Sequence, residues 1–68
     1  MTYHKSALAL AEQAADRYQQ AESLAGIGKT FHTMGDVASA EQHLETALAI
    51  FTDLGVPEAE QLRGELRR

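Results

Sequence analysis

Residues 24–54 read LAGIGKTFHTMGDVASAEQHLETALAIFTDL and predict two antiparallel helices. The turn between them is expected at residues 34–36 (Met-Gly-Asp), because glycine can take the left-handed conformation that closes a helix and aspartate can cap the next one. Small residues mark the points where the two helices must come close, at Gly28, Ala40 and Ala47. Larger apolar residues are expected to fill the spaces between the helices, and these are Leu24, Ile27, Phe31, Val37, Leu44, Leu48 and Phe51.

The flanking residues extend this helical pattern in both directions. Ala, Leu, Glu and Gln are abundant, and all four are strong helix formers. About four helices are predicted, over residues 2–15, 17–34, 37–54 and 57–67. The first of them has an apolar stripe at helical spacing, made of Tyr3, Ala7, Leu10 and Ala14. Gly55 is expected to end the third helix, and Pro57 suits the first turn of the fourth.

The junction between the first two predicted helices contains neither Gly nor Pro. A break at Ala15-Asp16 is favoured, because Asp16 can cap the next helix and a glutamine three residues later completes a capping box. A helix of about 30 residues would also be unusual in a small domain. The alternative is one long helix that reaches Met34, in which Asp16 is a solvated side chain.

The length of the chain restricts it to one small all-α domain over residues 1–68. A chain this short buries only about 60% of the surface that its unfolded state exposes, and it is marginally stable alone. It contains no cysteine, which excludes disulfides and thiolate metal sites. Additional copies, or a larger protein of which this chain is a fragment, are therefore expected to supply stability.

The charge and hydropathy of the chain argue against two classes of partner. The net charge is -4, whereas nucleic-acid-binding domains usually carry a basic face. No apolar run approaches the roughly 20 residues that span a membrane. Glu12 and Gln13 interrupt the N-terminal apolar stretch, so a signal peptide is not expected. The sequence predicts a cytoplasmic protein that contacts neither nucleic acid nor membrane through this segment.

The chain also repeats itself. Residues 4–10 (HKSALAL) parallel residues 44–50 (LETALAI), and residues 21–26 (AESLAG) parallel residues 59–64 (AEQLRG). The offsets are 40 and 38 residues, a period typical of stacked helical hairpins. One full hairpin flanked by two half units is therefore predicted.

The hairpin contains the motif Leu24-x-x-Ile27-Gly28-x-x-Phe31, followed by Gly35-Asp36, Ala40, Leu44 and Ala47. This pattern resembles the tetratricopeptide repeat, although Leu24 replaces a frequent Trp and Thr52 a frequent Pro. The longer unit is similar to repeats of multidomain bacterial regulators, including actinomycete antibiotic regulators. The resemblance implies a protein–protein interaction module, either self-associating or part of a larger bacterial regulator. The alternative is a structural or capping segment of a longer array, with no ligand of its own.

No enzyme chemistry, cofactor or metal is predicted. Residues 26–30 (GIGKT) suggest a phosphate loop, but Ser23 occupies the position where that loop requires a glycine, and no strand precedes it. The histidines His4, His32 and His43 lack the spacing of metal ligands on a helix.

The resemblance implies a binding groove lined by the first helix of each unit. The partner-binding candidates lie off the core stripe of the second predicted helix, and they are Glu22, Lys29, His32 and Thr33. The family's basic clamp for C-terminal carboxylates is not expected, because Glu22 and Gly26 stand where its cations would be. The expected partner is a protein or peptide. A homo-oligomer is also expected, because the outermost helices leave apolar faces uncovered.

Overall fold

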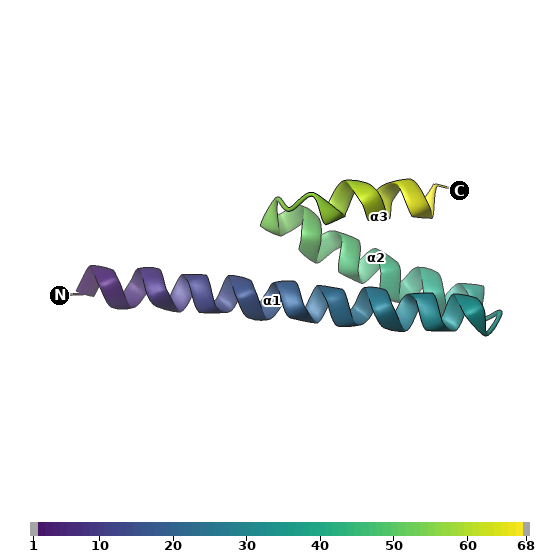
Figure 1. Ribbon diagram of the computed structural model, residues 1–68, viewed down its shortest axis with the longest axis horizontal. Helices are drawn as coiled ribbons and strands as arrows, with labels where there is room; N and C mark the ends of the chain where they lie inside the picture. The colour runs from purple at the N-terminus through teal and green to yellow at the C-terminus, as the bar shows by residue number, and fades with distance from the viewer. Residues whose placement is uncertain (1, 68) are drawn as a thin grey trace.

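The computed structural model describes residues 2–67, with side chains from Leu10 to Arg67. Within this range the chain forms three helices and no strand: α1 (Thr2–Thr33), α2 (Val37–Leu54) and α3 (Glu58–Leu66). α1 and α2 form an antiparallel hairpin, and α3 folds back along α2, so that α1 and α3 both flank α2 (Figure 1). The all-α prediction is confirmed, whereas the prediction of about four helices is wrong by one.

The difference lies in α1, which is one continuous helix of 32 residues. The predicted break at Ala15-Asp16 is therefore wrong, and the alternative of a single long helix is correct. The chain at this point has two alanines, the best helix formers, and Asp16 is exposed to solvent within the helix. The corresponding point of the second unit has Gly55, whose φ of 69° ends α2. Without such a residue, nothing in the local sequence stops α1.

The predicted turn between α1 and α2 is confirmed. Gly35 has a φ of 86°, in the left-handed region that glycine adopts without strain. Its backbone N–H donates to the carbonyl of His32 at 3.0 Å, and the N–H of Asp36 donates to the carbonyl of Phe31 at 2.9 Å. The Asp36 carboxylate then accepts a hydrogen bond from the backbone N–H of Ser39 at 3.2 Å, which caps α2.

Removal of this cap should weaken the hairpin. We expect Asp36→Ala to lower the free energy of unfolding by about 0.5–2 kcal/mol, because an N–H in the first turn of α2 loses its partner. Urea unfolding followed by circular dichroism measures the loss. Asp36→Asn keeps an oxygen acceptor and should stay within a few tenths of a kcal/mol of the original chain. An unchanged free energy of unfolding in Asp36→Ala would show that the cap contributes little.

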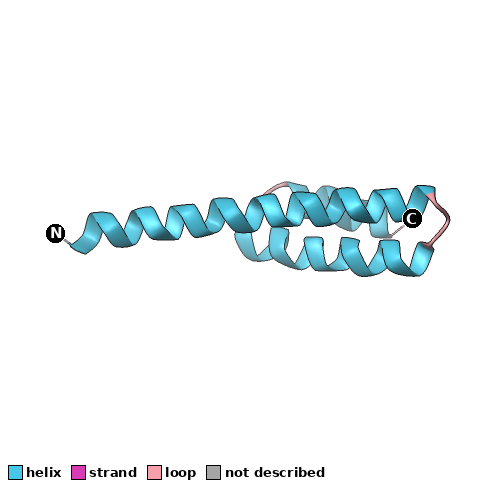
Figure 2. Cartoon of the chain, turned by 90° about the horizontal axis from the view of Figure 1, so that it is seen from below, coloured by secondary structure: helices cyan, strands magenta, loops and turns pink. Residues whose placement is uncertain are grey.

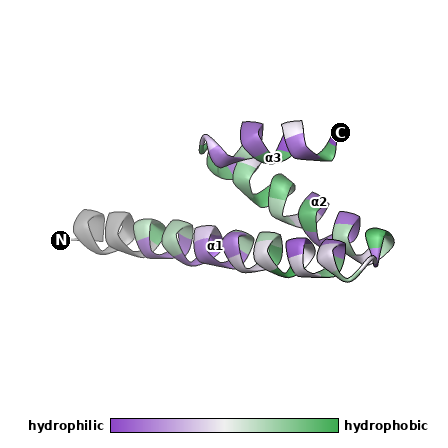
Figure 3. Cartoon of the chain, turned by 45° about the vertical axis from the view of Figure 1, so that its right-hand side comes forward, coloured by the Kyte–Doolittle hydropathy of each residue, from purple (hydrophilic) through white to green (hydrophobic). Residues whose placement is uncertain are grey.

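The core lies where α2 is covered by both neighbours, and much of the apolar sequence of the hairpin is carried by α2 (Figure 3). Its buried hydrophobic residues are Ala21, Ala40, Leu44, Ala47, Phe51, Ala59 and Leu62. The predicted contact points Gly28, Ala40 and Ala47 are all buried. Ile27 and Val37, in contrast, are 45% and 51% exposed, so the prediction that they fill the space between the helices is wrong.

The N-terminal half of α1 extends beyond the hairpin. Figures 1 and 2 show α1 running straight past the end of α2, and the molecule measures 52 × 18 × 12 Å. All residues from Leu10 to Arg17 are exposed, and Leu10 is 66% exposed. None of the helices in the described part of the chain is both long and apolar enough to cross a membrane.

Candidate protein-interaction surface

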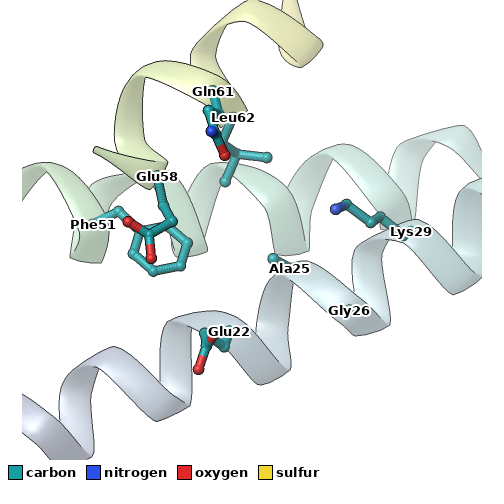
Figure 4. A pocket seen from close by; sticks show the side chains of 8 residues that line it. All are labelled: Glu22, Ala25, Gly26, Lys29, Phe51, Glu58, Gln61 and Leu62. Atoms are coloured by element: carbon teal, nitrogen blue, oxygen red, sulfur yellow. The ribbon is translucent and has the colours of Figure 1, made fainter. Parts of the chain in front are cut away.

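An open cavity of about 230 Å³ lies between α1 and α3, and its floor is formed by Phe51 of α2 and Leu62 of α3 (Figure 4). We call it the α1–α3 groove. Its lining residues come from all three helices, and they are Glu22, Ala25, Gly26, Lys29, Phe51, Glu58, Gln61 and Leu62. The two walls are related by the internal repeat, since residues 21–26 of α1 parallel residues 59–64, which lie in α3. The groove is therefore formed by equivalent helices of two successive units.

The floor of the groove is apolar and its walls carry charge. Phe51 and Leu62 are only 3% and 4% exposed, so both are packed into the core beneath the groove. Glu22 and Lys29 stand on the α1 wall, and Glu58 stands on the α3 wall (Figure 4). An apolar floor with a few polar groups of both signs is the usual composition of a binding site for a peptide or small molecule.

Tyr18 connects α1 to Glu58, one of the residues that line the groove. Its ring meets the ring of Phe51 edge-on, with centroids 5.7 Å apart, and its hydroxyl donates a hydrogen bond to the Glu58 carboxylate. This bond ties α1 to the beginning of α3 and fixes the orientation of Glu58. Next to it, Arg17 and Asp53 form an ion pair at 2.7 Å. Both partners are exposed, at 45% and 65%, so the pair adds little stability.

Only two of the four predicted partner-binding residues line the groove. Glu22 and Lys29 do so, whereas His32 and Thr33 are exposed one turn further along α1. The hydroxyl of Thr33 donates to the carbonyl of Lys29 at 3.1 Å. The role of all four residues in binding remains a prediction.

The α3 side of the groove was missed by reasoning from the sequence. Glu58 and Gln61 belong to the short helix that follows Pro57, and no motif marks them. The internal repeat could have identified them. It equates α3 with the groove-forming half of α1, so it would have placed polar residues of α3 on the same groove.

The opposite flank of the hairpin carries the second histidine of the described side chains. The His43 ring lies 5.1 Å from the ring of Phe31, and its Nδ1 lies 2.7 Å from the carbonyl oxygen of Ser39. The contacts of the His43 ring are therefore made within the hairpin. Exposed apolar side chains surround this flank, with Ile27 45% and Met34 71% exposed.

Antiparallel helices stacked around a groove define an α-helical repeat protein. The chain belongs to the tetratricopeptide repeat family, whose family model matches residues 2–53, all of α1 and nearly all of α2. Members of this family generally bind proteins or peptides and are typically non-catalytic. No curated protein and no solved structure matches this chain.

Proposed function

We propose that this chain is an interaction module that holds a segment of a protein partner in the α1–α3 groove. The observation that carries the proposal is the composition of the groove, an apolar floor of Phe51 and Leu62 with charges on both walls. An apolar side chain of the partner would cover the floor. The charges on the walls would then select partners with complementary charges and set the position of the bound segment along the groove. These charges belong to Glu22, Lys29 and Glu58.

The surface that contacts the partner extends beyond the groove along α1. His32 and Thr33 lie within one turn of Lys29 and are exposed, so a partner that leaves the groove toward the α1–α2 turn would meet them. We include both residues in the proposed contact surface.

The wider setting of the module is also part of the proposal. We infer a single domain over residues 1–68 that self-associates or acts within a larger bacterial regulator in the cytoplasm, without contact to nucleic acid or membrane through this segment. The net charge of -4 and the resemblance of the longer repeat unit support this setting. The second candidate is a structural or capping segment without a ligand, supported by the apolar flank that the hairpin leaves exposed.

The proposal predicts that reversing one charge in the groove weakens partner binding. We expect Glu22→Lys to reduce affinity by about tenfold, because a negative charge on the groove wall becomes positive and repels a partner selected for the original charge. The measurement is a pull-down with the native full-length protein, followed by titration of the captured protein against each variant.

Glu41→Lys is the matched control, since it makes the same charge change at an exposed position of α2 that does not line the groove. Capture that is lost with Glu22→Lys and kept with Glu41→Lys would support the groove. Equal capture by both variants would favour the structural role.

A further inference from the structure

α1 carries one stripe of small and apolar residues, interrupted only by Arg17, which we call the α1 seam. Its positions alternate in steps of four and three residues: Tyr3, Ala7, Leu10, Ala14, Arg17, Ala21, Leu24, Gly28 and Phe31. This spacing keeps them on one side of a helix and is the spacing by which two helices pack along a common line. Small residues occupy every second position of the seam, between larger ones.

α2 covers the C-terminal half of the α1 seam. Ala21 is fully buried, and a Cβ atom at Gly28 would lie 2.7 Å from Cγ of Leu44. The contact ends at Arg17, which pairs with Asp53 near the last turn of α2. Beyond that point α2 stops and α1 continues.

The N-terminal half of the α1 seam has no covering helix within the described residues. Leu10 is 66% exposed and Ala14 is also exposed. Tyr3 and Ala7 continue the same register, and their side chains lie outside those that the structure describes. Because α1 is a straight helix, this half cannot fold back onto its own hairpin (Figures 1 and 2).

We propose that a second copy of the chain covers this half, with the two N-terminal halves of α1 packed antiparallel about a two-fold axis. The inference rests on the self-association included in the proposed function and assigns the surface through which it occurs. In this arrangement each copy uses the same surface, as in most homodimers.

Two observations favour a second copy of the chain as the partner that covers this half of the seam. The first is continuity: an antiparallel α1 runs in the same direction as α2 and extends the α1–α2 interface from the point where α2 ends. The second is the internal repeat. Residues 4–10 parallel residues 44–50 of α2, the stretch that packs against α1 through Leu44 and Ala47. A second copy therefore brings a segment patterned like α2 to the free half of the seam.

The alternation of large and small residues selects the antiparallel orientation. It allows a register that sets Leu10 against the partner's Ala7, and Tyr3 against the partner's Ala14. Large side chains then fill the space that small ones leave, and the two helices interdigitate. A parallel pair would set Leu10 against its own equivalent and leave gaps at the alanines. The positions that flank this half of the seam hold no formal charge, and they are His4, Ser6, Ala11 and Gln13.

The first test compares two variants that each raise the net charge by one unit. Leu10→Lys places a charge in the proposed interface, whereas Glu12→Gln changes an exposed residue on the opposite side of α1. We expect the native chain and Glu12→Gln to sediment as dimers at micromolar concentration. We expect Leu10→Lys to raise the dimer dissociation constant by at least about tenfold, because two leucines lose their apolar contacts.

Folding does not confound this comparison, because Leu10 is exposed and the hairpin core lies elsewhere. Circular dichroism and the unfolding midpoint, measured at a concentration where the native chain is monomeric, should agree among the three proteins. If Leu10→Lys dimerises as strongly as the native chain, the proposed interface is wrong and the chain self-associates through another surface. A native chain that stays monomeric throughout would overturn both. Neither result bears on the groove, which Glu22→Lys tests separately.

The second test determines the orientation. The chain has no cysteine, so Gln19→Cys provides a single labelling site on the outer side of α1. In the proposed register the two nitroxide labels of a dimer are offset along the helix axis by about 30 Å, at 1.5 Å per residue. A parallel pair would have no axial offset and a label separation near the width of two helices, about 20 Å. Pulsed electron resonance should give a distance above 30 Å, and a peak at the shorter distance would overturn the antiparallel arrangement.

Discussion

Phe51→Ala is expected to cause the largest loss of stability of any single change considered for this chain. The ring is 3% exposed, meets Tyr18 edge-on and forms part of the floor of the α1–α3 groove beside Leu62. Truncating a buried phenylalanine costs about 3–5 kcal/mol, because apolar burial is lost and a cavity remains. A domain of this size has a total stability of roughly 3–10 kcal/mol, at 0.05–0.15 kcal/mol per residue. A single change at Phe51 therefore removes a large share of it.

The measurement is the helical signal in circular dichroism and its urea midpoint, compared with Phe31→Ala. This control removes the same atoms from a ring that is only half-buried, on the other flank of the hairpin. We expect it to cost about half as much, because less apolar area leaves water on folding. If the two variants lost equal stability, Phe51 would not be the main support of the core.

Gly28→Ala and Gly26→Ala are expected to change stability in opposite directions, although both place the same methyl group in α1. A Cβ atom at Gly28 would lie 2.7 and 2.9 Å from two carbons of Leu44 and 3.1 Å from the carbonyl oxygen of Ala40. Leu44 is buried and the carbonyl belongs to the α2 backbone, so neither can move freely. Overpacking of this kind costs about 1–3 kcal/mol, which exceeds the gain in helix propensity of about 1 kcal/mol.

At Gly26, no described residue comes within 4 Å of an added Cβ atom. Gly26→Ala therefore gains helix propensity without a steric cost, and it should raise the free energy of unfolding by up to about 1 kcal/mol. Parallel urea titrations of the two variants and the native chain test the difference in sign. A stabilised Gly28→Ala would show that α1 and α2 can separate at this point without loss.

Both predictions follow from the way a small domain distributes its contacts. Of the seven buried hydrophobic residues, four are alanine and one is phenylalanine. The core therefore consists largely of close helix contacts at small residues and of one large ring. Removing the ring opens a cavity, and adding a methyl group at the closest approach forces the helices apart. Exposed positions of the same helices tolerate substitution because their side chains contact few neighbouring atoms.

Local backbone preferences made much of the fold predictable. Gly35 and Gly55 end helices because they adopt positive φ, and Asp36 caps α2 through its own side chain. The contact points Gly28 and Ala40 were predictable because a small residue within the apolar stripe of a helix leaves room for the backbone of a second helix. Each of these signals acts within about one helical turn, and the structure confirms them all.

The groove was only partly predictable. Glu22 and Lys29 were found from the periodicity of α1 and the family resemblance, and the structure places both on one wall. Glu58 and Gln61 come from another helix some thirty residues along the chain, and the fold of α3 over α2 brings them there. Such a juxtaposition depends on the direction in which α3 leaves Gly55, which no short motif specifies.

The helical class, the turn at residues 34–36, the close contacts of the hairpin and the repeat that relates α1 to α3 can all be read from the amino-acid sequence. The continuation of α1 through Asp16 and the exposure of Ile27 and Val37 became clear only from the folded chain. An apolar side chain such as Ile27 is buried only where another helix packs against it, and that surface exists only in the folded chain. At Asp16 a capping signal competes with the helix propensity of the neighbouring alanines, and the helix continues there although residues 10–17 are exposed.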